Sequence, residues 1–361
     1  MRLPVLALVA VLVAGCSSSA PRPRPTASPT PSAAPERAAA GAVPRACPVS
    51  SARSDGAVEA GGSAVSVSEK PLALVTDGVA KELPARGTVD LTALACSADG
   101  RVALGWIEHR GERVQRLRLA VGERVVTLVR SSDYDGLNPF LSGLALAFEP
   151  DGELLVAYGE RGRVRAVTVS RAGKLGRRVT LGRTSEYTSV VAEVAANGRA
   201  VVAWATEDSG LQVDLPILVR AATRDSGRLF GEARTVDKGT SVDPDEGAPL
   251  DLVLAVSANG RAALMWNDVT GSYKRGGFRH PVLVGSLDGK PRRVAAHGEI
   301  RDVAIRDDGT VLAVFVSRGR LRAAVGDSDP VDLGAADSAR ASFDADGRGV
   351  VEFASGKVVR P

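Results

Sequence analysis

Cysteine, histidine and aromatic residues are scarce in this sequence. The 361 residues include 3 cysteines and 3 histidines, and aromatic residues make up 4%. The histidines His109, His280 and His297 stand far apart in the chain, so no zinc-binding signature is present. Gly-x-Ser-x-Gly, phosphate-binding Gly-Lys-Ser/Thr and His-Glu-x-x-His motifs are also missing. We therefore expect no metal, no cofactor and no catalytic residue of these classes.

Long apolar runs are missing too, apart from one near the start. Leu3 to Ala14 is apolar for 12 residues, which suits the core of a signal peptide and is too short to span a bilayer as a helix. Leu12-Val13-Ala14-Gly15-Cys16 follows and resembles the lipobox of bacterial lipoproteins. The resemblance implies cleavage before Cys16 and a covalent diacylglyceryl and acyl lipid (such as palmitate) on it. It also implies a protein anchored by that lipid to the extracytoplasmic face of the cell membrane.

The net charge of +4 belongs to the N-terminal part of the chain. The first 46 residues contain five arginines and one acid, which leaves 41 basic and 41 acidic residues in the rest. A neutral body disfavours nucleic acid as a partner. Because 16–46 is rich in Pro, Ser, Thr and Ala without apolar periodicity, we predict a disordered tether there. The predicted organisation is a signal peptide over 1–15, the tether over 16–46 and one domain over 47–361.

Two cysteines remain if Cys16 is acylated. Cys47 and Cys96 would lie in a compartment that permits disulfides, and we predict that they form one. The alternative is that Cys96, at a regularly apolar position, is a small buried hydrophobic residue.

One pattern occurs six times in the body of the chain. An alternating apolar run leads to an Asp-Gly or Asn-Gly pair, and a second run then ends in an aromatic residue six positions after the glycine. The glycines are Gly100, Gly152, Gly198, Gly260, Gly309 and Gly347, and the aromatic residues are Trp106, Tyr158, Trp204, Trp266, Phe315 and Phe353. Such pairs favour β-hairpins with tight two-residue turns, in which positive φ is required. The aromatic residues are expected to be core.

The repeat predicts an all-β fold. Two further β-like runs usually follow each aromatic residue, and successive glycines are 38 to 62 residues apart, which is the range of four-stranded propeller blades. The body resembles a β-propeller with six four-stranded blades. In this arrangement the hairpin in 71–83 would complete the last blade. The alternative is a seven-bladed propeller in which 48–84 forms an irregular extra blade.

The loops away from the glycine turns vary in length and composition, so we expect a binding face there. The candidate residues are Asp133, Tyr134, Asp135, Tyr187, Asp243, Asp245, Glu246, Asp268, Tyr273, Arg275, Phe278 and His280. Acids just beyond the aromatic positions would line the same rim: Glu108, Glu160, Glu207 and Asp268.

Several hypotheses compete for this face. Alternating oxygen-bearing side chains over 133–138 suggest a calcium loop, but the later glutamate of such loops is missing, and a solvated turn is the alternative. Cations between aromatic residues in 273–280 suit an anionic glycan or a peptide. Two rim carboxylates would suit a glycosidase.

From these features we expect a binding or scaffolding module at the cell envelope, for a glycan, a peptide or another protein, rather than an enzyme. The alternatives are a glycan-active hydrolase or lyase that uses rim carboxylates, and a structural assembly factor of a membrane complex.

Overall fold

The computed structural model describes residues 45–46, 51–53, 58–60, 63–69, 71–97, 99–111, 114–132, 141–184, 188–207, 215–242, 251–272, 277–335, 339–353 and 355–361. The chain divides into two units, Met1–Arg37 and Ala38–Pro361, and every described residue belongs to the second. Within the described residues, no helix is long and apolar enough to cross a membrane.

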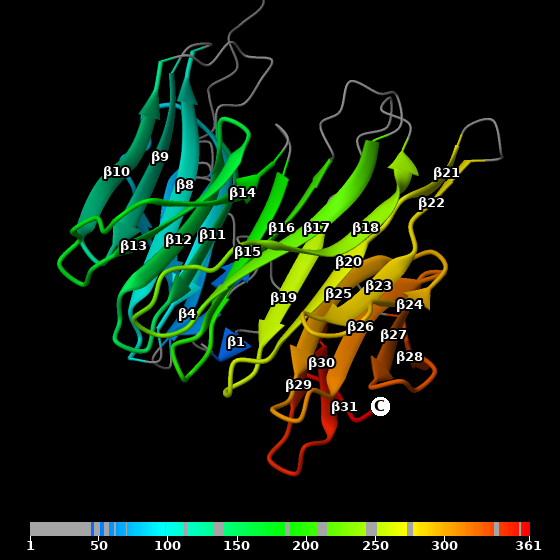
Figure 1. Ribbon diagram of the computed structural model, residues 1–361. Helices are drawn as coiled ribbons and strands as arrows, with labels where there is room; N and C mark the ends of the chain where they lie inside the picture. The colour runs from blue at the N-terminus through cyan, green and yellow to red at the C-terminus, as the bar shows by residue number, and fades with distance from the viewer. Residues whose placement is uncertain are drawn as a thin grey trace, which may run out of the picture. The chain divides into compact units, whose positions relative to one another are not determined.

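Seven sheets, which we number as blades 1 to 7, make up most of the described structure (Figure 1). They are antiparallel apart from the pairing of β1 with β3, which is parallel. In spatial order, blade 1 contains β1 (Arg45–Ala46), β3 (Val58–Ala60), β4 (Ser63–Glu69), β5 (Leu72–Thr76) and β6 (Val79–Glu82). Blade 2 contains β10 (Arg124–Ser131), β9 (Val114–Val121), β8 (Val102–Arg110), β7 (Thr88–Cys96) and β2 (Ser51–Arg53). Arg45 and Ala46, at the end of the predicted tether, therefore belong to a strand.

The next two blades have four strands each, in chain order. Blade 3 contains β11 (Leu141–Phe148), β12 (Leu154–Glu160), β13 (Arg163–Val169) and β14 (Val179–Arg183). Blade 4 contains β15 (Thr188–Val194), β16 (Ala200–Glu207), β17 (Leu215–Arg224) and β18 (Arg234–Val242).

Among the described residues, one blade has extra strands inserted between two of its own, and it is one of the last three blades. Blade 5 contains β19 (Leu252–Val256), β20 (Ala262–Asn267), β23 (Val282–Ser286) and β24 (Arg292–Ala295). Between β20 and β23 there is a two-stranded ribbon of β21 (Thr270–Ser272) and β22 (Gly277–Arg279). We call this ribbon the arm. Blade 6 contains β25 (Glu299–Ile305), β26 (Val311–Ser317), β27 (Arg320–Val325) and β28 (Val331–Gly334). Blade 7 contains β29 (Ala339–Phe343), β30 (Gly349–Phe353) and β31 (Val358–Val359).

All six predicted hairpins are confirmed, as β7–β8, β11–β12, β15–β16, β19–β20, β25–β26 and β29–β30. The predicted two-residue turn is wrong. In blade 3, Glu149 donates its N–H to the carbonyl of Glu153, and Gly152 donates to the carbonyl of Glu149. Gly152 has a φ of 82°, while Asp151 is not among the described residues with positive φ. The loop is therefore a three-residue type I turn with a glycine bulge, because only the glycine adopts positive φ.

The Asp or Asn before each turn glycine has a different role from the predicted one. Asp151 Oδ1 accepts the N–H of Glu153 at 2.9 Å, and Asn197 Oδ1 accepts the N–H of Arg199 at 2.9 Å. Asp308 does the same with Thr310 at 2.8 Å. In blades 3, 4 and 6 this side chain thus stabilises the turn from within, while the glycine supplies the backbone conformation. In blades 2 and 7 the corresponding N–H groups of Arg101 and Arg348 are accepted by Ser97 Oγ at 3.0 Å and Asp344 Oδ1 at 2.9 Å.

The six aromatic residues of the repeat are core, as predicted. Each belongs to a different hydrophobic cluster, and each of the six clusters joins one blade to the preceding one. Trp204, for example, is fully buried and belongs to the same cluster as Leu181 of blade 3. Gly182 makes room for it, because a Cβ there would lie 2.6 Å from the indole. The second strands read as nearly continuous apolar runs since they are buried on both faces; β12 is buried at every position.

The architecture is an all-β propeller with seven blades, so the seven-bladed alternative is correct and the count of six is wrong. The hairpin of β5 and β6 was expected to complete the last blade. It pairs instead with β4 in blade 1. Blade 7 has three strands within the described residues.

A further regularity appears only in the strand pairing. Opposite the aromatic residue, the third strand places a cation in blades 2, 3, 4 and 6, as the pairs Trp106–Arg118, Tyr158–Arg165, Trp204–Arg220 and Phe315–Arg322. In blade 7 the Lys357 ammonium lies 5.3 Å from the ring centre of Phe353. Blade 5 has Leu283 opposite Trp266. In blade 2 the Arg118 guanidinium carbon lies 5.2 Å from the ring centre of Trp106.

Candidate functional site

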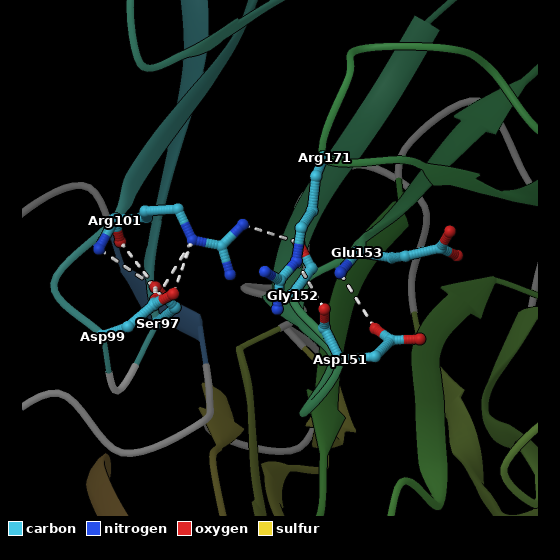
Figure 2. A network of polar contacts seen from close by, with 7 residues as sticks. All are labelled: Ser97, Asp99, Arg101, Asp151, Gly152, Glu153 and Arg171. Atoms are coloured by element: carbon cyan, nitrogen blue, oxygen red, sulfur yellow. Dashed lines mark hydrogen bonds and ion pairs between the residues drawn. The ribbon is translucent and has the colours of Figure 1, made fainter.

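The end of the sheets that carries the glycine turns is held together by polar contacts between blades. Arg101 of blade 2 donates from Nη1 to the carbonyl of Gly152 in blade 3 at 2.8 Å (Figure 2). Arg306 of blade 6 makes the same contact with the carbonyl of Gly347 in blade 7 at 2.8 Å. A Cβ at Gly152 would overlap the guanidinium of Arg101, which gives this glycine a second reason to be present. These arginines connect neighbouring turns.

In the middle blades, side-chain amides of asparagine connect neighbouring turns. Asn197 Nδ2 donates to the carbonyl of Asn259 at 2.8 Å, and Asn259 Nδ2 donates to the carbonyl of Asp307 at 2.9 Å. Consecutive blades 4, 5 and 6 are joined in this way. Many polar groups of the turn end are therefore used in structural contacts.

Local contacts shift the pKa values of two acids in these turns. A hydrogen bond from the Ser97 hydroxyl, followed by one from Arg101, lowers the pKa of Asp99 (Figure 2). Burial, helped by the charges of Asp151 and Glu149, raises the pKa of Glu153. Both shifts follow from local turn contacts and do not indicate a shared proton site.

At the opposite end, Glu108 was expected to line an open acidic rim, and this expectation is wrong. Glu108 is 1% exposed. Its Oε2 accepts the indole N–H of Trp106 at 3.0 Å and the backbone N–H of Arg86 at 2.9 Å. Its Oε1 lies 3.6 Å from Arg116 and 3.8 Å from Arg118. The carboxylate is a structural acceptor that neutralises two arginines of β9.

Glu160 has the same role in blade 3. It is 7% exposed, and its carboxylate lies 3.1 Å from Arg165 Nε and 3.3 Å from Arg178 Nη1. Arg178 in turn donates to the carbonyl of Leu128 in blade 2 at 3.0 Å. The charge of Glu160 is therefore balanced within the protein, and the carboxylate helps to join blades 2 and 3.

The arm of blade 5 is joined to its blade by a small polar cluster. Asn267 Nδ2 donates to the carbonyls of Gly298 at 2.9 Å and His280 at 3.4 Å. His280 donates its backbone N–H to Nδ1 of His297 at 3.2 Å, and the two imidazole centres are 5.6 Å apart. Asp268, 9% exposed, donates its N–H to the carbonyl of Pro281 at 3.0 Å. Two predicted candidates, Asp268 and His280, therefore lie together at the base of the arm.

A histidine–carboxylate contact lies at the same end of blade 2. His109 Nδ1 is 2.7 Å from Oδ1 of Asp90. The pairing of β7 with β8 shifts register between Val89 and Leu91, which marks a bulge at Asp90. The spacing of these residues in the sequence gives no sign of the contact, because it depends on the bulge.

The remaining predicted residues are placed as follows. Phe278 lies in β22. Lying outside the described residues are Cys16, Cys47, Asp133, Tyr134, Asp135, Tyr187, Asp243, Asp245, Glu246, Tyr273 and Arg275. Of Glu207, the backbone at the end of β16 is described. The calcium hypothesis for 133–138 therefore stays untested. Where side chains are described, no group of three His, Cys, Asp or Glu residues is placed to hold a metal ion.

Comparison with known proteins gives a likeness to propeller structures only. No protein-family model matches the chain, and no curated protein matches it. An α-L-arabinanase of Penicillium chrysogenum, complexed with arabinobiose, is 10% identical, with 72% of this chain and 88% of that chain covered and a TM-score of 0.39. The β-propeller domain of the trilobed protease of Pyrococcus furiosus is 12% identical, with 82% and 92% covered and a TM-score of 0.40. A catalytically inactive virginiamycin B lyase of Staphylococcus aureus, with quinupristin, is 13% identical, with 85% and 92% covered and a TM-score of 0.40. Similarity this low says nothing about activity.

Proposed function

We propose that this protein is a lipid-anchored binding or scaffolding module at the cell envelope and that its ligand meets the loop end of the propeller. The observation that carries the proposal is the burial and ion pairing of Glu108 and Glu160. Both carboxylates are buried and each is neutralised by two arginines. An acid and base pair for glycan hydrolysis needs carboxylates that reach the substrate. These two side chains support the structure instead.

The arm and the longer connections at this end are the proposed binding region. The connection between β16 and β17 spans 208–214, and that between β18 and β19 spans 243–251, whereas every glycine turn has the same short form. Variable loops on a rigid scaffold are where binding sites usually lie. We assign the ligand to the glycan, peptide or protein classes by the aromatic and cationic residues of 273–280.

The binding proposal is tested with purified cell envelopes in a sedimentation assay. A double variant Tyr273→Ala and Arg275→Ala should reduce binding at least tenfold, whereas Arg318→Ala, in the turn between β26 and β27, should not change it. Equal binding by both variants would contradict the arm as the site. Turnover of envelope polysaccharide that is abolished by Asp268→Asn would establish the alternative, a glycan-active enzyme. Co-purification with a membrane complex would instead support an assembly factor.

We further propose that the lipid on Cys16 is the anchor. The apolar run and the Leu12–Cys16 motif support this assignment. A Cys16→Ser variant should move from the membrane to the soluble fraction after cell lysis or remain as an unprocessed precursor. Wild-type processing and an unchanged membrane fraction would refute lipidation at this residue.

A disulfide between Cys47 and Cys96 belongs to the same proposal. Cys96 is 1% exposed in β7, and the other two cysteines, Cys16 and Cys47, lie outside the described residues. If Cys16 carries lipid, Cys47 is the remaining partner. A thiol assay on the unfolded, unreduced protein should find no free thiol, and two free thiols would exclude the bond.

A further inference from the structure

The glycine turns of blades 4 and 5 carry an asparagine before the glycine, where the other four carry an aspartate. Asn197-Gly198 and Asn259-Gly260 are the two Asn-Gly pairs of the sequence. In such a pair the glycine nitrogen can attack the side-chain carbonyl carbon of the asparagine, because glycine has no side chain to shield its nitrogen. Both asparagines are exposed, so water reaches them. The two turns therefore meet the chemical requirements for deamidation.

Deamidation of Asn197 would proceed in two steps. The nitrogen of Gly198 forms a bond to Cγ of Asn197 while the Cγ–Nδ2 bond breaks, and the proton of the glycine N–H passes through water to the departing amide, which leaves as ammonia. The product is a cyclic succinimide. A water molecule then opens one of the two C–N bonds of the ring, which gives aspartate or isoaspartate. No electrons are gained or lost in either step.

In the folded protein, the groups that would react at Asn197 take part in hydrogen bonds. Gly198 donates its N–H to the carbonyl of Ala195 at 2.9 Å. Asn197 Oδ1 accepts the N–H of Arg199 at 2.9 Å, and its Nδ2 donates to the carbonyl of Asn259 in blade 5 at 2.8 Å. Ring closure turns the side chain toward the glycine nitrogen, so these contacts must open first. The fold therefore slows the reaction.

Asn259 is held by more contacts than Asn197. Its Nδ2 donates to the carbonyl of Asp307 in blade 6 at 2.9 Å, and its backbone N–H donates to Oδ1 of the same aspartate at 2.9 Å. Its Oδ1 also accepts the hydroxyl of Ser257 at 2.8 Å. In blade 4 the residue in place of Ser257 is Ala195, which has no hydroxyl. Asn259 is therefore expected to react more slowly than Asn197.

The local sequences of the two sites are the same. Each asparagine stands in Ala-Asn-Gly-Arg-Ala, which comprises 196–200 in blade 4 and 258–262 in blade 5. Neighbouring side chains therefore influence the two reactions equally in an unfolded chain. Any difference between the two rates in the folded protein reports on the contacts of the turns alone.

We propose that Asn197 is a site of spontaneous deamidation and that the reaction breaks the contact between the turns of blades 4 and 5. The Nδ2 group that donates to the carbonyl of Asn259 is lost as ammonia. The carboxylate that replaces it accepts hydrogen bonds but donates none. In the isoaspartate product the main chain also runs through the side-chain carbons, which changes the shape of the turn. The contact cannot form again.

The test follows both sites in the full-length chain by peptide mass spectrometry during incubation in mildly alkaline buffer. In urea the two asparagines should react at similar rates, because their local sequences agree. In the folded protein both should react more slowly, and Asn197 should react about fivefold faster than Asn259 or more, since one additional hydrogen bond is worth about fivefold in the opening equilibrium.

Two variants with the same change in charge separate the contacts of Asn259 from general effects. Asp307→Ala removes the carboxylate that accepts the N–H of Asn259, and should speed deamidation there about fivefold, with a smaller effect at Asn197. Asp346→Ala, at an exposed residue in the glycine turn of blade 7, should leave both rates unchanged.

Hydrogen–deuterium exchange shows what the modification does to the fold. In protein that has been deamidated at Asn197, exchange should become faster in 257–261, the turn of blade 5 that accepts the hydrogen bond. Equal rates at the two asparagines in the folded protein would overturn the proposal. An unchanged rate at Asn259 in Asp307→Ala, or exchange in 257–261 that does not respond to deamidation, would overturn it as well.

Discussion

Replacement of Glu108 by alanine distinguishes a structural carboxylate from a catalytic one. The side chain is almost completely buried, and it accepts two hydrogen bonds, from the indole of Trp106 and from the backbone of Arg86. It also faces two arginines, Arg116 and Arg118, whose side chains are 15% and 12% exposed. In Glu108→Ala, two donors lose their acceptor and two nearly buried cations lose their counter-ion.

The size of the effect follows from these contacts. A hydrogen bond to a charged group contributes about 1.5 to 3 kcal/mol, so the two together give about 3 to 6 kcal/mol. Removal of one member of a buried ion pair costs about 3 to 5 kcal/mol, which describes the same loss from the side of the arginines. The two ranges overlap because they count the same contacts. We expect Glu108→Ala to lower the free energy of unfolding by about 4 kcal/mol.

Urea unfolding followed by tryptophan fluorescence measures this change, since Trp106 contacts the altered position. Glu123→Ala, at an exposed residue of the β9–β10 turn, is the control and should stay within about 0.5 kcal/mol of the wild type. Glu108→Gln keeps an acceptor but loses the charge, and should give an intermediate value. A cost below about 1 kcal/mol for Glu108→Ala would refute the structural role.

Two other substitutions test local features of the blades. Gly143→Ala should lower the free energy of unfolding by more than about 2 kcal/mol, because φ is +56° and the new Cβ would lie 2.7 Å from Val190. Gly111 has a similar φ of +59° but open space around it, so Gly111→Ala should lower the free energy of unfolding by about 1 kcal/mol. Equal costs would contradict the role of packing. The Tyr158 hydroxyl is buried without a hydrogen-bond partner among the described residues, and burial raises the pKa of Tyr158 to about 12. Because tyrosine in an unfolded chain ionises near pH 10, folding stability should fall by about 2 to 3 kcal/mol as the pH rises from about 10 to 12. Tyr158→Phe should remove that part of the fall, and an unchanged alkaline profile would exclude it.

Six of the seven blades could be predicted from the sequence because one short motif serves local and long-range structure at once. The turn glycine has positive φ, and the aromatic residue six positions later fills the contact with the preceding blade. The predicted turn length is wrong because an Asp-Gly pair is compatible with both a two-residue and a three-residue loop. Whether the aspartate adopts positive φ is decided by strand register, which composition does not reveal.

Blade 1 lacks the repeat for a physical reason. In every other blade, the aromatic residue belongs to the cluster shared with the blade before it. Among the described residues no blade precedes blade 1, and 45–82 contains no aromatic residue. A search for the repeat therefore finds every blade that has a predecessor and misses the first one. The Asp77–Gly78 turn of blade 1 also joins β5 and β6, so it marks a different hairpin from the others.

The polar partners at the loop end could not be predicted, because they are set by pairing across strands whose connections differ in length. Glu108 and Glu160 each stand eight residues after a turn glycine and read as open rim acids. The arginines that neutralise them come from the third strand of the same blade and, for Glu160, from the segment leading into the fourth. Arg118 follows its turn glycine by 18 residues, whereas Arg165 follows its own by 13. The spacing between the turn glycine and the arginine varies along the sequence, so the sequence alone does not reveal the pattern. In the sheet, each arginine is paired with the aromatic residue of its own blade. An acid near a strand end therefore indicates an open site only when the strand opposite it offers no arginine.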